Sequence, residues 1–159
     1  MLEGLNQIVD FLSARARSAW SLGAGKVYIG EDKAEKSGPN TRYAAIVWEN
    51  VEADHYPAFI EFMVRPLYVV YVGPPPPGKR GEAAKTQLFA DFLDRFEPPE
   101  NIQLEQVGMR YDEDWDVPKA AVVSLVIEFS ATWHEKRTRV HSLGGSASIR
   151  TSGAPLLIP

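Results

Sequence analysis

Residues 73–79 have the spacing most suggestive of chemistry, because they read G-x-x-x-x-G-K between an expected strand and an expected helix. A phosphate-binding loop of this spacing points its backbone N–H groups at the phosphates. Residues 74–77 are all proline and carry no N–H, and Arg80 stands where a hydroxyl would hold magnesium. We therefore reject nucleotide binding. We interpret the prolines as a stiff polyproline II spacer in preference to an SH3-type ligand.

An acidic run is the second candidate site, formed by Asp112, Glu113, Asp114, Trp115 and Asp116. Several carboxylates together could hold a hard cation, but their spacing departs from the D-x-D-x-D-G loop pattern. A solvated turn between two strands, whose charge discourages aggregation at a sheet edge, is the simpler interpretation. A third is that the acids line the channel of an assembly. We predict no metal site here.

The remaining polar candidates suggest no catalytic group. The histidines, His55, His134 and His141, lie in no short motif with a nucleophile or a carboxylate. Glu61, in an apolar strand, could be a general acid, or could lie at an edge or pair with Arg65. Trp48, Trp115 and Trp133 could form a ligand box, but aromatic residues on strands more often belong to a core or an interface. The sequence predicts no enzyme, no catalytic residue and no cofactor.

A hairpin over residues 107–133 is the element that would position the acidic run. The odd positions from 121 form an unbroken apolar face: Ala121, Val123, Leu125, Ile127, Phe129, Ala131 and Trp133. Strict alternation is typical of a half-buried antiparallel strand, because successive side chains point to opposite faces. Pro118 would fix the start of this second strand.

The rest of the chain supplies two helices and further strands. An amphipathic helix is predicted from residue 2 to between 19 and 23, then a short strand over 26–30. Residues 31–41 and 52–57 are predicted as loops, with strands over 43–51 and 58–72 and a bulge or edge at Pro66. A second helix is predicted over residues 82–96 and ends before two prolines. This order predicts an α+β fold, with a mostly antiparallel sheet and both helices on one face. We expect a domain over residues 1–135 and an extended C-terminal arm over 136–159.

Composition excludes several classes of protein. The 159 residues are enough for one domain, and 45% hydrophobic with 24% charged residues is typical of globular proteins. A net charge of −4 disfavours an electrostatic nucleic-acid binder. Without cysteine there is no disulfide or thiolate zinc site. We expect no transmembrane helix, since no apolar run approaches about 20 residues, and no secretory signal at the N-terminus.

The order of elements resembles that of tail terminator proteins (minor tail or tail-completion proteins) of long-tailed bacteriophages. The likeness covers residues 5–135: an amphipathic helix, a Val27–Tyr28 strand, two antiparallel strands, a crossing helix, and a hairpin whose acidic turn contains Trp115. The proline spacer and the residues after Lys136 depart from the pattern. The resemblance implies a non-enzymatic virion protein, made in the host cytoplasm. It would close into a hexameric ring on the tail tube, end tube growth and join the tail to the head-proximal connector or stopper.

The resemblance also implies where contacts lie. Loops 31–41 and 52–57 and the acidic turn would face the tube or the lumen, through which DNA passes without sequence-specific binding. The C-terminal arm lies outside the resemblance, and we expect it to embrace a neighbouring subunit through Arg137, Arg139, Leu156, Leu157 and Ile158. Another neck ring protein, such as a stopper or head-completion protein, is the near alternative, and a small-molecule-binding α+β enzyme the distant one. No membrane partner is expected.

Overall fold

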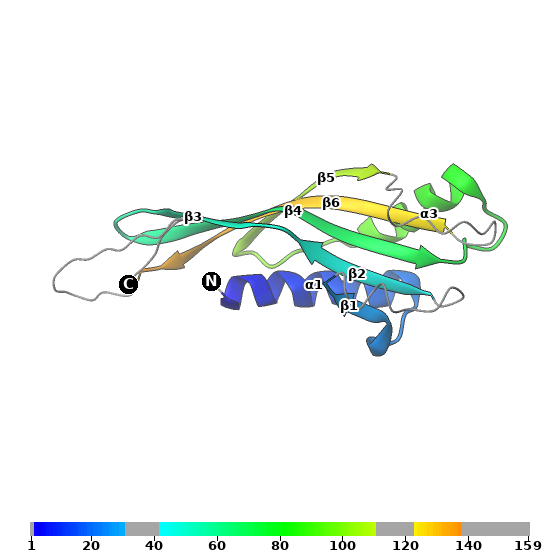
Figure 1. Cartoon of the computed structure of the whole chain (residues 1–159), viewed down its shortest axis with the longest axis horizontal. Helices are drawn as coiled ribbons and strands as arrows, with labels where there is room; N and C mark the ends of the chain where they lie inside the picture. Colours follow the sequence, from blue (N-terminus) through cyan, green and yellow to red (C-terminus); the bar gives the residue numbers. More distant parts are fainter. Residues whose placement is uncertain (1, 31–41, 111–122, 138–159) are drawn as a thin grey trace.

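A computed structural model describes residues 2–30, 42–110 and 123–137 of the chain. In this part, two α-helices cover one face of a six-stranded mixed sheet (Figure 1). The fold is therefore α+β, as the sequence predicts. The last described strand ends at Lys136, and the domain boundary expected at residue 135 stays a prediction.

Helix α1 (Leu2–Trp20) forms where the apolar residues recur every three or four positions. The side chains that it buries lie on one stripe, namely Leu5, Ile8, Leu12, Ala16 and Trp20. The helix ends where Ser21 takes a left-handed conformation (φ 52°). The backbone N–H of Leu22 then donates to the Arg17 carbonyl, which satisfies one of the last helical acceptors. The predicted first helix is confirmed.

The sheet has the order β1-β2-β4-β6-β5, with β3 paired to the first half of β4. Its strands are β1 (Val27–Ile29), β2 (Tyr43–Trp48), β3 (Val51–His55), β4 (Phe59–Gly73), β5 (Ile102–Arg110) and β6 (Val123–Lys136). β1 runs parallel to β2, and the other pairings are antiparallel. The predicted hairpin is confirmed as the β5–β6 pair, although β5 begins at Ile102, earlier than the sequence indicated.

Two sequence predictions about strands need correction or refinement. The expected loop over residues 52–57 is wrong, because Val51–His55 form β3, with Glu52 and Asp54 exposed. Alternation of charged with small or apolar residues was the signal for this edge strand. At Pro66 the β4–β6 register shifts between Val64 and Leu67, so the predicted irregularity is a bulge.

Helix α3 (Gly81–Leu93) lies beside the C-terminal half of α1, and the two are joined by polar contacts to the backbone. Trp20 donates its indole N–H to the Leu88 carbonyl at 3.0 Å. The guanidinium of Arg15 donates to the carbonyls of Asp91 and Phe92 at 3.0–3.2 Å. These carbonyls belong to the last turns of α3, where the negative end of the helix dipole also attracts the positive charge of Arg15.

The second helix was predicted to reach residue 96, but α3 ends at Leu93. Arg95 adopts a positive φ of 56°, so the chain turns before the two prolines. Phe96 nevertheless packs into the core, where its ring lies 5.6 Å from Phe129 and 5.1 Å from Phe11. Phe96 therefore continues the apolar pattern of the helix in the sequence because its side chain is buried, although the residue itself lies beyond the end of α3.

The main core lies between the helices and the sheet, on what we call the helix face. The odd positions of β6 from Val123 to Trp133 all point into it, as the alternation predicts. On the second face of the sheet a smaller apolar cluster is also buried. Its members are Tyr43, Ala45, Val47, Val70, Val72 and Val126, with Tyr28 and Tyr68 packed against them. β2 is therefore apolar on both faces.

Candidate interaction surfaces

The two strand ends that flank the acidic run lie at one end of the sheet, which we call the turn end. Asp112, Glu113, Asp114, Trp115 and Asp116 lie outside the described residues, but the strands on either side of them are described. β5 ends at Arg110, and β6 begins at Val123 opposite Gly73 of β4. The spacer of prolines and α3 follow Gly73 at this same end. The ends of β5 and β6 that flank the acidic run therefore lie where β4 passes into α3.

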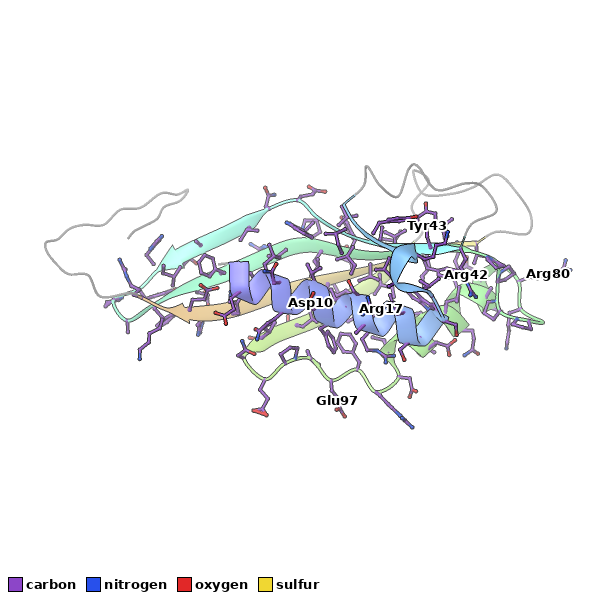
Figure 2. The ribbon with its side chains drawn as sticks, turned by 90° about the horizontal axis from the view of Figure 1, so that it is seen from below. Asp10, Arg17, Arg42, Tyr43, Arg80 and Glu97 are labelled. Carbon is purple, nitrogen blue, oxygen red and sulfur yellow. The ribbon has the colours of Figure 1, made fainter. Side chains whose placement is uncertain are left out.

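Arg42 joins three elements at the turn end. Its guanidinium donates to the Ser21 carbonyl at 3.0 Å, just beyond the C-terminus of α1, where a cation is favoured by the helix dipole. Its aliphatic part lies against Gly73, where a Cβ would come within 2.7 Å of Arg42 Cγ. Figure 2 shows Arg17 and Arg42 near this end of α1, and Arg80 projecting at the extremity of the molecule. These contacts give Arg42 a structural role.

Tyr71 anchors the start of the proline spacer. Its hydroxyl donates to the Pro74 carbonyl at 2.7 Å, and its side chain is almost fully buried beside Trp20. Burial raises the pKa of Tyr71 to about 12, although the charge of Arg42 opposes the shift. Tyr71 therefore stays protonated and acts as a structural donor. The motif over residues 73–79 forms a turn, since Lys79 N–H donates to the Pro76 carbonyl.

The opposite end of the sheet is an extension made of β3, the first half of β4 and the end of β6, which we call the β-extension. Tyr56 stacks on Phe59 at 4.9 Å, and Phe59 packs against His134 at 4.5 Å. Tyr56 is 42% exposed although it is large and apolar. Arg137 closes the tip, because its side chain donates to the Tyr56 carbonyl and its backbone N–H to the Ala58 carbonyl. Aromatic and arginine side chains of this kind are enriched at protein interfaces.

Glu61 pairs with His134 and not with Arg65, which was one of the alternatives left open by the sequence. Glu61 and His134 face each other across β4 and β6, and His134 Nε2 lies 2.9 Å from Glu61 Oε2. Arg65, four residues along the same strand, lies 3.8 Å from Glu52 instead. Cross-strand neighbours have Cβ atoms about 5 Å apart, whereas residues at i and i+4 of one strand are about 13 Å apart. Both members of the Glu61–His134 pair are partly exposed, at 29% and 55%.

The described tryptophans belong to the core. Trp133 is 2% exposed, stacks on Phe62 at 5.5 Å and donates its N–H to Glu135 at 2.9 Å. Trp48 packs against the same core but pairs with Leu67 of β4, whose partner on β6 is Phe129, so it is set apart from Trp133 and the two do not form a ligand box; Trp115 lies outside the described residues. Burial alone would raise the pKa of Glu135. Hydrogen bonds, including those from Trp133 and the Gly4 backbone, outweigh burial and lower it.

The C-terminal arm begins at the tip of the β-extension. Arg137 is the only one of its predicted contact residues within the described ranges, and its bonds are to the β3–β4 turn of its own chain. Arg139, Leu156, Leu157 and Ile158 lie outside them, as does the loop over residues 31–41. The roles assigned to these residues remain predictions.

Sequence reasoning missed the exposed apolar side chains on the outer strands. Among the described residues, Ile29 is 43% exposed on β1 and Val107 is 59% exposed at a bulge of β5, between Gln106 and Gly108. Isoleucine and valine are typical of strands, but only the strand order shows that β1 and β5 lie at the two sides of the sheet.

Within residues 2–30, 42–110 and 123–137, His, Asp and Glu side chains form no group of three that could hold a metal ion. In the same ranges, neither helix combines the length and apolar character that crossing a membrane requires. Comparison with known protein families and with curated proteins finds no match to this chain.

Proposed function

We propose that this chain is the tail terminator of a long-tailed bacteriophage. It would form a hexameric ring that caps the tail tube, ends tube growth and joins the tail to the head-proximal connector. The order of elements on which the family resemblance is based agrees with the described fold: helix, short strand, antiparallel strands, helix and hairpin. The observation that carries the proposal is a sheet whose two ends differ, with strands at its sides that are unpaired in the described part.

The two ends suit a protein that must bind different partners on opposite sides. The strand ends that flank the acidic run lie at the turn end, whereas the aromatic tip and the start of the C-terminal arm are at the other. β6 spans 14 residues between them, or roughly 45 Å at about 3.3 Å per residue. A terminator needs this asymmetry, because it must bind the last ring of the tube and then offer a different surface.

The physical logic of termination follows from symmetry. A tube built through head-to-tail contacts grows without limit, unless a component binds its end and cannot present that end again. Exposed aromatic residues such as Tyr56 and unpaired strands are surfaces through which such a component could bind. The chain's net charge of −4 suits a ring through which DNA passes without adhering.

The test is the length of the tails when the chain is missing or shortened. In phage lacking the gene, we expect tubes of uncontrolled length that do not join heads, and labelled protein at the head-proximal end of normal tails by electron microscopy. A chain truncated after Arg137 keeps the bonds to Tyr56 and Ala58. It should therefore unfold like the full chain in urea yet assemble poorly. Tails of normal length joined to heads in the absence of this chain would refute the proposal.

The same experiment separates the alternatives. Loss of a stopper or head-completion protein would leave tails of normal length that fail to join heads. An enzyme would be absent from purified tails. A chain that never associates and tightly binds a metabolite or metal would also contradict the proposed function.

A further inference from the structure

The outer strands of the sheet run in opposite directions. β1 is parallel to β2, β2 is antiparallel to β4, β4 to β6, and β6 to β5, so β1 and β5 are antiparallel to each other. They lie on opposite sides of the sheet, and no described segment pairs with the outer side of either (Figure 1). A second copy rotated about an axis parallel to the strands would bring its β5 antiparallel to β1, the more favourable pairing.

The two outer strands are also compatible in which side chains they place on each face. On β1, Val27 and Ile29 lie on the helix face, opposite Ala44 and Ile46. On β5, Ile102 and Leu104 lie on the same face and pack against the main core. A strand pairing must keep apolar residues on one face, since a slip of one residue would reverse every side chain.

One register satisfies the faces and the charges together. If Ile29 stands opposite Ile102 and Val27 opposite Leu104, then Lys26 stands opposite Glu105 and Tyr28 opposite Gln103. Lys26 and Glu105 are both exposed, so this places a cation beside an anion across the junction. Slips of two residues preserve the faces but separate the two charges.

Pairing of β5 with a second β5 is disfavoured by charge. Glu105 lies on this strand, and Glu97 and Glu100 precede it in the segment after α3. Figure 2 shows Glu97 projecting outward from this segment, beside the helix layer. Although Arg110 ends β5, a two-fold contact centred near Glu105 would bring these three acidic residues close to their copies, whereas β1 follows the basic Lys26.

We propose that β1 of one copy pairs antiparallel with β5 of the next, with Lys26 opposite Glu105, so that the sheet continues from copy to copy around the ring. This inference rests on the proposed ring and names its subunit interface. The contact is heterologous, as a closed ring larger than a dimer requires. β1 has only three residues, so the ladder is short and far below the roughly 1,000 Å² of a stable interface. The ladder sets the register between neighbouring subunits. Other contacts and the closure of the ring stabilise the assembly.

Because the chain has no cysteine, engineered disulfides can test the register directly. Directly opposed residues of antiparallel strands have Cα atoms about 4.5–5.5 Å apart, within the range that a disulfide bridges. In the full-length double variant Lys26→Cys/Glu105→Cys, mild oxidation should yield a ladder of covalent multimers on non-reducing gels, ending at the closed ring. Each single variant should remain monomeric. The control Ala14→Cys/Glu105→Cys should also remain monomeric, because Ala14 is exposed on α1 and belongs to neither outer strand.

Charge reversal gives a second readout without covalent chemistry. Lys26→Glu and Glu105→Lys should each weaken ring formation about two- to fivefold per junction, the range for exposed ion pairs. The double reversal should restore it.

The outcomes separate this inference from the proposed function. A covalent dimer from Glu105→Cys alone would show that two β5 strands meet, and would overturn the interface. The interface would also be overturned if rings are seen on tails but the double-cysteine variant does not cross-link. In that case the terminator function would stand. If no ring forms in solution or on tails, both proposals fail.

Discussion

Replacing Gly4 with alanine should destabilise the protein, although alanine is the better helix former. Gly4 lies in the first turn of α1, directly against the Trp133 indole of β6. A Cβ built on Gly4 would overlap Trp133 Nε1, Cδ1 and Cε2. The indole cannot easily move away, because it is 2% exposed, stacked on Phe62 and hydrogen-bonded to Glu135. Either the N-terminus of α1 must lift from the sheet or the Trp133–Glu135 bond must be lost.

The opposing contributions can be compared. Overpacking a core costs about 1–3 kcal/mol, and loss of a partly exposed hydrogen bond to a carboxylate about 1 kcal/mol more. Alanine in place of glycine gains at most about 1 kcal/mol of helix propensity. The net expectation for Gly4→Ala is a loss of about 2 kcal/mol. For a chain of 159 residues, this corresponds to a fall in Tm of about 4–8 °C.

Urea unfolding followed by tryptophan fluorescence measures this difference. Gly23→Ala is the matched control, because nothing lies within 4 Å of the Cβ it would add and its φ is −72°; its stability should change by less than about 0.5 kcal/mol. In a Trp133→Leu background the cost of Gly4→Ala should shrink, since the smaller side chain leaves room. If Gly4→Ala is as stable as the native chain or more so, the close packing of α1 on Trp133 is refuted.

Three further predictions concern single side chains. Phe129→Ala should cost about 3–5 kcal/mol in urea unfolding, because Phe129 is fully buried between Phe92 and Phe96, whereas exposed Val107→Ala should change little. Since its folded pKa is raised to about 12, Tyr71 contributes stability that is fully present below about pH 10 and lost as the pH rises towards 12. Tyr71→Phe should remove this alkaline dependence and cost about 1 kcal/mol at neutral pH; an unchanged alkaline profile would refute the assignment. Since its folded pKa is lowered, Glu135 stabilises the fold above its ordinary pKa of about 4.3 and ceases to do so as the pH falls through the folded value. Glu135→Gln should therefore flatten the acid limb of the stability profile, and an equally steep limb would count against its ionised role.

The polar contacts of Glu135 and Arg42 show how the two ends of α1 are fixed to the sheet. At its N-terminus, Glu135 of β6 accepts from the Gly4 backbone, which places a carboxylate at the positive end of the helix dipole. At its C-terminus, Arg42 donates to the Ser21 carbonyl. Opposite charges thus stabilise the two ends of the same helix, one from β6 and one from the residue that precedes β2.

The amino-acid sequence by itself determined the type of most elements, because their signals are local. The period-two pattern of residues 123–133 identified β6 and its buried face, and the spacing of Leu5, Ile8 and Leu12 identified α1. Pro66 indicated the bulge, since proline cannot donate to a ladder. Backbone geometry imposes these periods whatever lies elsewhere in the chain, so they could be recognised in the sequence.

Only the tertiary structure decided which elements meet. The pairing of Glu61 with His134, the contact of Gly4 with Trp133, and the positions of β1 and β5 at the sides of the sheet join residues far apart in the chain. Strand order and register select such partners, and many arrangements share the same local pattern. The short strand β3 and the end of α3 were misjudged for the same reason. Pairing to β4 turned a charged segment into a strand, and the turn at Arg95 ended a helix whose apolar stripe continues to Phe96.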